Sequence, residues 1–375
     1  MTLGPVVDNM AVVICCGPGG AGKTTTAAAI ALHAAAKGRR ACVVTIDPAK
    51  RLADALGLEA LTNTPGQIQG DWPGELWALM LDTKGTFDDL VSRYAATRQQ
   101  AEAILGNRLY RNISGALSGT QEYMAVEKLY ELAHEGVNAG GPQPTRFDLI
   151  VLDTPPTRNA LDFLDAPRRL TSFLDNRIFR LLVMPTRAYL RAVSVATQTL
   201  LRTISKVVGT ELVGDAINFF NAFEGMEQGF RARADAVAKL LADEGTGFIV
   251  VTSPRSDAIQ EAAFFVERLL EAKLDVNALV VNRLHPRFLA EGDEPPGEGN
   301  GSALALLAAN LDDFRRVGER EEVHFADLAR RVAPAPVARV PFLADDVHDL
   351  DGLTIIERHL FGLGGAEPAA DARPQ

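Results

Sequence analysis

The sequence is short of the features that mark secreted, membrane-spanning and nucleic-acid-binding proteins. Its 375 residues include only three cysteines, and none of them forms a Cys-x-x-Cys pair, so structural disulfides and a zinc site of that kind are not expected. No apolar run approaches the roughly 18 residues that would span a bilayer. No basic stretch followed by an apolar one opens the chain, as it would in a signal peptide. We therefore expect a soluble, cytoplasmic protein without a transmembrane segment.

Positive charge is also scarce. Lys and Arg number 38 against 48 Asp and Glu, for a formal net charge of −10. A nucleic-acid-binding surface would need a concentration of Lys and Arg. The nearest candidate, Arg168, Arg169, Arg177 and Arg180, is spaced like the charges of a solvated helix face. No nucleic-acid partner is expected.

What the sequence does contain is a series of short apolar runs that alternate with helical patterns. This alternation is typical of a parallel sheet covered by helices, with strands buried on both faces. The predicted fold class is α/β, with a mostly parallel central sheet flanked by helices. The predicted strands are Met10–Cys16, Arg40–Ile46, Leu76–Leu81, Phe147–Leu152, Phe248–Thr252, Ala278–Val281 and Val337–Val340, and the Ala-rich segment Lys23–Ala36 predicts a helix.

Two helical stretches interrupt this alternation, at residues 86–136 and 168–245. They predict a helical insertion subdomain within one domain that spans residues 1–363, followed by a disordered tail, 364–375. An apolar stripe in the second stretch fits either a face packed on the core or a groove for a client. Its residues are Phe173, Ile178, Phe179, Leu182, Leu200, Leu201, Ile204, Val208, Phe219, Phe220 and Phe223.

A glycine-rich loop follows the first predicted strand. Residues 17–24 read Gly-Pro-Gly-Gly-Ala-Gly-Lys-Thr and satisfy the P-loop pattern G-x-x-x-x-G-K-[ST] between a strand and a helix. Glycines let backbone N–H groups curl around phosphate oxygens at the positive end of the following helix. Lys23 would reach the terminal phosphates of ATP, and the Thr24 hydroxyl would ligate Mg²⁺. The predicted nucleotide-binding residues here are Gly19, Gly20, Ala21, Gly22, Lys23, Thr24 and Thr25.

A dinucleotide-binding fold is the competing interpretation. Gly17, Gly19 and Gly22 also satisfy G-x-G-x-x-G, and Asp47 ends the second strand, where such folds keep a ribose-binding acid. However, a dinucleotide fold needs neither Lys23 nor Thr24 directly after its last glycine. Asp47 is moreover followed by Pro-Ala-Lys-Arg, which predicts a loop. These features favour the P-loop over an oxidoreductase.

Aspartates end two of the predicted strands. Asp153 follows four apolar residues, the Walker-B pattern, which places a carboxylate beside the Mg²⁺ held by Thr24; a helix N-cap is the alternative. Asp47 lies at the edge where open α/β sheets bind ligands, and it could orient or deprotonate the attacking water. We therefore predict Asp47 and Lys23 as catalytic residues, and Thr24 and Asp153 as the metal ligands.

Three residues near later strands are candidates for the base pocket. Asn282 follows a predicted strand, and its amide could pair with adenine, although such an Asn is often a turn residue. Pro341 and Phe342 could form a wall of the same pocket or simply pack.

In this order, the segments around Lys23, Asp47, Asp153 and Asn282 resemble those of the ArsA family, over about residues 10–350. This family includes the arsenite-pump ATPases and the ATPases that target tail-anchored proteins. The resemblance implies a Mg-ATP-hydrolysing dimer that couples its nucleotide state to a protein client or partner, a membrane protein being one candidate. It also implies that Asp47 is the catalytic switch aspartate, Asp153 the Mg²⁺ aspartate and Asn282 the adenine contact.

The sequence departs from the family in several places. Pro18 stands where the family has a signature lysine that reaches the partner's phosphates. The consequences left open are slow hydrolysis, a substitute cation such as Lys50 or Arg51, and a heterodimer with a lysine-bearing paralogue instead of a homodimer. Arg158-Asn159 replaces Gly-His. Because no cysteine matches the metalloid-binding triad, arsenite binding is not expected.

Other functions remain as alternatives. One is an ATPase subunit that energises an anion or metalloid exporter, and another is a nucleotide-sensing scaffold with weak hydrolysis. A partitioning ATPase is disfavoured because the sequence shows neither a terminal amphipathic helix nor a basic DNA surface.

Overall fold

The computed structural model describes residues 2–47, 51–108, 110–111, 120–136, 146–155, 164–165, 215, 218–219, 221–286 and 302–363. Some predictions lie outside these residues: the roles of Lys50 and of Arg158-Asn159, the basic group of 168–180, most of the apolar stripe and the tail 364–375.

An eight-stranded sheet has the order β3-β4-β2-β5-β1-β6-β7-β8. All its neighbouring pairs are parallel except β3 and β4, so the predicted α/β class with a mostly parallel sheet is confirmed. Each predicted strand is present with its ends shifted by a few residues. The edge strand β3 was missed because it is three residues long and buries only Ile68. The strands are β1 Val12–Cys16, β2 Arg40–Thr45, β3 Gly66–Ile68, β4 Glu75–Met80, β5 Leu149–Asp153, β6 Thr246–Thr252, β7 Val276–Leu284 and β8 Val337–Pro341.

The chain divides into two compact units, which are described separately. Unit 1 comprises Met1–Met80, Leu132–Leu161 and Glu244–Gln375, and unit 2 comprises Leu81–Glu131 and Asp162–Asp243. The single-domain organisation expected for 1–363 stays a prediction.

The helices of unit 1 are α1 Gly4–Val7, α2 Lys23–Ala36, α3 Arg51–Ala55, α14 Ser256–Glu271, α15 Ser302–Val332 and α16 Leu350–Phe361. Those of unit 2 are α4 Thr83–Tyr94, α5 Arg98–Leu105, α7 Thr120–Tyr130 and α13 Glu227–Leu241. A π-helical turn, Glu131–Glu135, follows α7.

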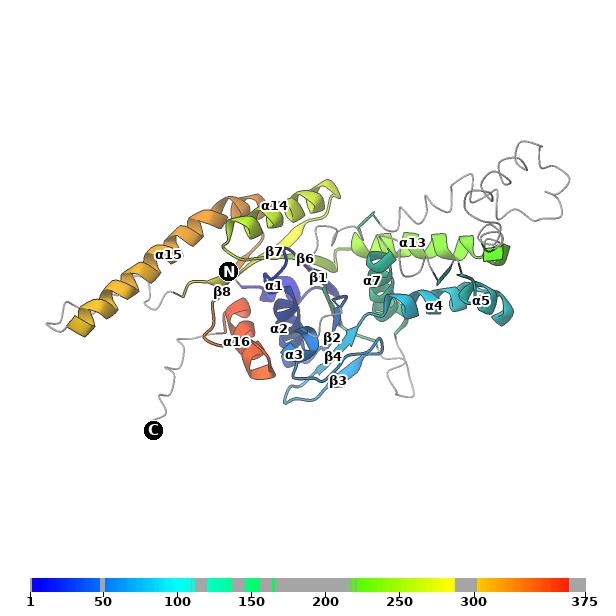
Figure 1. Ribbon diagram of the computed structural model, residues 1–375, viewed down its shortest axis with the longest axis horizontal. Helices are drawn as coiled ribbons and strands as arrows, with labels where there is room; N and C mark the ends of the chain where they lie inside the picture. The colour runs from blue at the N-terminus through cyan, green and yellow to red at the C-terminus, as the bar shows by residue number, and fades with distance from the viewer. Residues whose placement is uncertain are drawn as a thin grey trace. The chain divides into compact units, whose positions relative to one another are not determined.

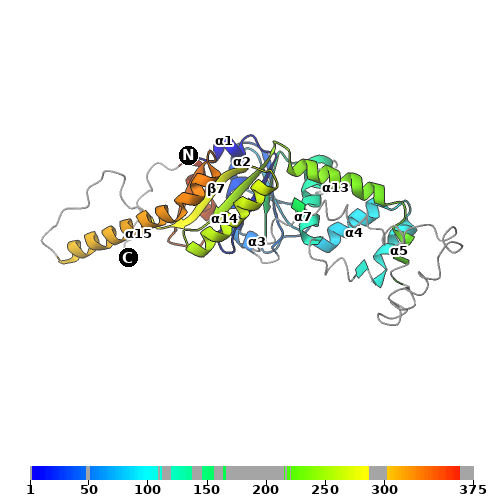
Figure 2. The same cartoon turned by 90° about the horizontal axis from the view of Figure 1, so that it is seen from above.

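Helices cover both faces of the sheet in unit 1. Figure 1 shows α2, α3 and α16 on one side of the strands and α14 and α15 on the other. Figure 2 shows α14 lying along β7. The buried alanines of α2 let its backbone pack close to the strands, because their methyl groups take up little space. This close packing fixes the start of α2, which carries Lys23.

Unit 2 has a core of its own. Arg233 forms a buried ion pair with Glu127 at 2.6 Å, and its guanidinium lies over the ring of Tyr130. Phe219 and Phe223, at the described end of the apolar stripe, are buried and lie close to other aromatic rings. In this part of the stripe, the core interpretation is the one that fits.

The described residues can be compared with two features of the sequence, its lack of long apolar runs and its three cysteines. None of the helices in the described part of the chain has the length and apolarity needed to cross a membrane. None of Cys15, Cys16 and Cys42 forms a disulfide, and all three are buried in β1 and β2.

Candidate nucleotide-binding site

The loop between β1 and α2 adopts a conformation that requires glycine at two positions. Gly17 has φ 144°, and a Cβ there would lie 2.0 Å from the carbonyl oxygen of Val251. Gly22 has φ 95°, and a Cβ there would lie 2.1 Å from Nδ2 of Asn282. The loop is therefore packed against β6 and β7 at these points, which shapes the start of α2.

Lys23 lies inside this loop, with only 5% of its surface exposed. Its ammonium group donates hydrogen bonds to the carbonyl oxygens of Gly17 and Pro18, each at 3.0 Å. Burial lowers the pKa of Lys23, while the charge of Asp153 opposes that shift. Phosphate oxygens could take over the two carbonyl contacts, because they are stronger acceptors for an ammonium group.

Asp153 accepts hydrogen bonds from two hydroxyl groups on neighbouring elements. Its Oδ2 accepts hydrogen bonds from Thr24 at 2.7 Å and from Thr45 at 3.0 Å. The sheet order explains this convergence, because β5 lies between β1, which leads to Thr24, and β2, which ends in Thr45. Burial raises the pKa of Asp153 from 3.8 to about 6, against the lowering effect of these hydrogen bonds and of Lys23.

The residues around Asp153 fit a magnesium ion. Its Oδ1 is buried and has no hydrogen-bond partner within the described residues. The Thr24 hydroxyl is the donor in its hydrogen bond to Asp153, so the lone pairs of its oxygen remain available to a cation. Mg²⁺ prefers oxygen ligands and usually keeps several waters and phosphate oxygens. In the described part of the chain, no three His, Cys, Asp or Glu side chains are grouped so that they could hold a metal ion by themselves, and a site of this kind does not need such a group.

Thr45 links Asp153 to Asp47, a role that the sequence analysis missed. Its hydroxyl donates to Asp153 and accepts a 3.2 Å hydrogen bond from the backbone N–H of Asp47. The carboxylate of Asp47 lies 3.4 Å from the guanidinium of Arg51. The sequence did carry a signal for this role of Thr45, since it is a polar residue at the end of an apolar strand, two positions before an aspartate.

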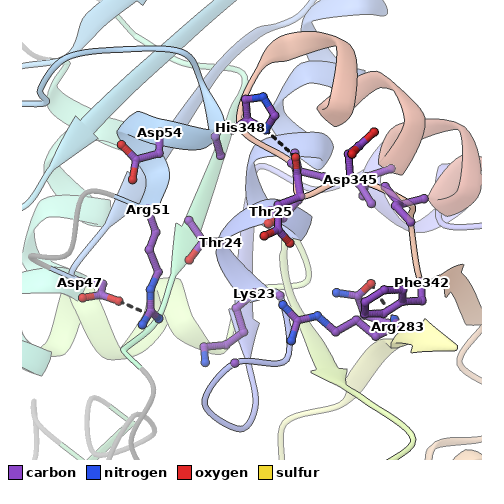
Figure 3. Close-up of a pocket in the computed structure, with 18 of the residues that line it drawn as sticks. Lys23, Thr24, Thr25, Asp47, Arg51, Asp54, Arg283, Phe342, Asp345 and His348 are labelled. Carbon is purple, nitrogen blue, oxygen red and sulfur yellow. Dashed lines mark hydrogen bonds and ion pairs between the residues drawn. The ribbon is translucent and has the colours of Figure 1, made fainter.

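Lys23, Thr24, Asp47 and Arg51 border one pocket of about 530 Å³, shown in Figure 3. Its size is within the range of small-molecule sites. Asp153, Gly19 and Ala21 are not among the residues that border it, and the carbonyl of the buried Ala21 accepts a hydrogen bond from Asn282, which does border it. The ionisable residues that the sequence did not place here are Asp54, Arg283, Asp345, Asp346 and His348. The predicted residues that do border the pocket are Gly20, Gly22, Lys23, Thr24, Thr25, Asp47, Asn282, Pro341 and Phe342.

Asn282 lies within β7 instead of following it, as the sequence had suggested. The strand continues to Leu284 past an irregularity in which Arg283 has φ 60°. Nδ2 of Asn282 donates to the carbonyl of Ala21 at 2.9 Å, and Oδ1 accepts from the N–H of Arg283. Asn282 therefore supports the P-loop directly, and its adenine contact stays a prediction. Phe342 is 61% exposed beside the pocket, which disfavours simple core packing.

Comparison with known proteins decides the family. The model of the ArsA-type family, described as anion-transporting ATPases, matches residues 10–294. The chain belongs to this family. It is an ATPase, and its function depends on nucleotide.

Individual relatives of this ATPase are distant. The ATPase ASNA1 homolog of Trypanosoma cruzi is 26% identical over 360 residues, which are 90% of this chain and 87% of that protein. ATPase GET3B of Arabidopsis thaliana is 28% identical over 289 residues, 72% of this chain and 63% of that protein. The arsenical pump-driving ATPase of Acidiphilium multivorum is 26% identical over 303 residues, 80% of this chain. The chain spans only 44% of the pump-driving ATPase.

Proposed function

We propose that this ATPase is a dimeric switch in which the hydrolysis of Mg-ATP controls the binding of a protein client or partner. One observation carries the proposal. The chain enters the helical unit 2 at Asp162, nine residues after Asp153, which accepts hydrogen bonds from Thr24 at the P-loop and from Thr45 at the end of β2. A change at Asp153 on loss of the γ-phosphate would therefore be transmitted along a short covalent connection.

Each residue of the site has a part in the proposed reaction. Lys23 binds the terminal phosphates, and Asp47 orients a water molecule for attack on the γ-phosphorus. Thr24 and Asp153 would hold Mg²⁺, which neutralises phosphate charge when bound. Asn282, Pro341 and Phe342 would receive the base. The described residues that border the pocket all belong to unit 1.

The dimer rests on the family resemblance, and both a homodimer and a heterodimer are compatible with it. Pro18 favours a lysine-bearing paralogue as partner if the chain alone turns over slowly. A membrane protein is one candidate for the client.

The test is ATP hydrolysis by the purified chain, with its mass in solution recorded with and without Mg-ATP. Asp47→Asn should retain ATP binding and lose most turnover, whereas Asp257→Asn, on the exposed surface of α14, should behave as wild type. Hydrogen exchange in unit 2 should differ between the Mg-ATP and Mg-ADP states. Unchanged exchange with normal hydrolysis would remove the switch and leave the ATPase.

A second candidate function is to energise an anion exporter. It is favoured by the similarity to the arsenical pump-driving ATPase. The burial of Cys15, Cys16 and Cys42 in β1 and β2 argues against binding of a metalloid such as arsenite. Hydrolysis that rises on addition of arsenite or antimonite would reverse this ranking.

A further inference from the structure

The pocket contains more fixed positive charge than the P-loop lysine supplies. Among its bordering residues, the side chains with such a charge are Lys23, Arg51 and Arg283. During phosphoryl transfer, negative charge spreads over the equatorial oxygens of the γ-phosphoryl group, and a cation placed there stabilises the transition state. Lys23 emerges from the loop that carries Pro18, and Pro18 itself offers no donor.

The two arginines lie at different parts of the pocket. Arg283 directly follows Asn282 on β7, on the side assigned to the base. Arg51 begins α3, and its guanidinium lies 3.4 Å from Asp47, the residue proposed to orient the water. In Figure 3 the guanidinium of Arg51 lies between Asp47 and the tip of Lys23. Arg51 is therefore the arginine placed at the phosphate end.

The ion pair between Arg51 and Asp47 is weak enough for a phosphoryl group to replace Asp47 as the partner of the guanidinium. The Arg51 side chain is 59% exposed, and it is joined to Asp47 by an ion pair four residues apart in the sequence. Ion pairs of this kind stabilise a protein little, because water screens them and two side chains must be ordered. A phosphoryl group arriving beside Asp47 could thus draw the guanidinium towards its oxygens, with bidentate geometry that a lysine lacks.

We propose that Arg51 is a catalytic residue that stabilises the transferring γ-phosphoryl group within its own chain. The inference rests on the proposed hydrolysis of Mg-ATP at this site. The water oxygen forms a bond to the γ-phosphorus, and the bond from that phosphorus to the β–γ bridging oxygen breaks. The bridging oxygen keeps the electron pair as part of ADP, and one proton of the water is released as inorganic phosphate forms. Arg51 contacts the oxygens of the phosphoryl group while these bonds change.

The experiment compares Arg51→Ala and Arg51→Lys with Arg316→Ala. Arg316 is a matched control, because it pairs with Asp312 at the same four-residue spacing on α15, away from the pocket. Arg51→Ala should lower kcat about 100-fold or more, with KM and the affinity for a non-hydrolysable ATP analogue changed less than about threefold. Arg51→Lys should recover part of kcat, since it restores charge without the planar fork.

A binding measurement separates this role from a structural one. Mg-ADP with aluminium fluoride imitates the phosphoryl group in transit, so Arg51→Ala should weaken its binding much more than the binding of the ATP analogue. Equal weakening of both ligands, or normal turnover by Arg51→Ala beside an inactive Lys23→Ala, would overturn the proposal while leaving the ATPase site intact.

Mixing tests the assignment to the same chain. A mixture of the Lys23→Ala protein with the Arg51→Ala protein should stay inactive, because every site then lacks one of the two residues. Activity restored by mixing would show that Arg51 acts at the partner's site. A wild-type chain that neither hydrolyses ATP nor binds Mg-ADP with aluminium fluoride would refute the underlying function instead.

Discussion

The hydroxyl of Thr24 donates a 2.7 Å hydrogen bond to the buried carboxylate of Asp153, joining the start of α2 to the end of β5. This pairing brings the P-loop and the Walker-B strand into contact. It also leaves Oδ1 of Asp153 buried without a hydrogen-bond partner in the described residues. The arrangement is one that a cation would complete.

Asp153 should make stability depend on pH. Its pKa in the folded protein is raised from 3.8 to about 6, so between these values the folded state holds a proton that the unfolded state has lost. The contribution of Asp153 is therefore most favourable below pH 3.8 and declines as the pH rises through 6. The full change is about 3 kcal/mol.

Urea unfolding of the metal-free protein between pH 4.5 and 7.5 measures this effect. Asp153→Asn imitates the protonated side chain and does not titrate. As the pH rises, the free energy of unfolding of this variant should therefore increase relative to that of the wild type. Asp71→Asn, in an exposed loop, should show no such gain. A constant difference between wild type and Asp153→Asn would contradict the raised pKa.

Lys23→Ala should weaken the binding of ATP about 10- to 100-fold, because charge-assisted hydrogen bonds contribute about 1.5–3 kcal/mol. Titration calorimetry with a non-hydrolysable analogue measures it. Lys37→Ala is a matched control, since Lys37 is exposed at the other end of α2. If Lys23→Ala bound the analogue as tightly as Lys37→Ala, the phosphate site would have to lie elsewhere.

Gly22→Ala should destabilise the protein more than Gly20→Ala. Both glycines have positive φ, which strains alanine by about 1–2 kcal/mol. Only at Gly22 would the new Cβ meet another residue, Nδ2 of Asn282, whereas at Gly20 nothing lies within 4 Å. Urea unfolding should show an additional loss of at least about 1 kcal/mol for Gly22→Ala.

Adding Asn282→Ala to Gly22→Ala tests the contact itself. Because the clash is then removed, the double variant should be more stable than the sum of the two single losses predicts. Strict additivity would show that Gly22 and Asn282 do not meet in solution.

Arg233→Met should be among the most damaging single changes in unit 2. It leaves the Glu127 carboxylate buried without its guanidinium, at a cost of about 3–5 kcal/mol. Arg93→Met, which removes a partly exposed pair with Glu131, should cost less than about 1 kcal/mol. Thermal unfolding ranks the two.

Replacing both partners is the complementary measurement. Arg233→Met combined with Glu127→Leu removes both buried charges, so it should recover much of the lost stability. A double variant as unstable as Arg233→Met alone would show that packing around Tyr130, and not the buried charge, dominates the loss.

The local sequence was enough to predict the α/β class, the P-loop and the aspartates at the strand ends. Glycines before Lys23 and apolar runs before Asp47 and Asp153 act over a few residues, so their consequences are visible without the rest of the chain. The same reasoning missed β3 and placed Asn282 after a strand, because short edge strands and irregular strand ends carry little local pattern.

Tertiary structure decided which of these residues meet. The position of β5 between β1 and β2 brings Thr24 and Thr45 onto one carboxylate oxygen of Asp153, which no spacing in the sequence encodes. The contact of Asn282 with the P-loop likewise depends on the register of β7, far along the chain. The sequence by itself determined that this protein has the residues of a nucleotide site, because each motif is local. Their arrangement was decided by strand order and burial, which are properties of the whole sheet.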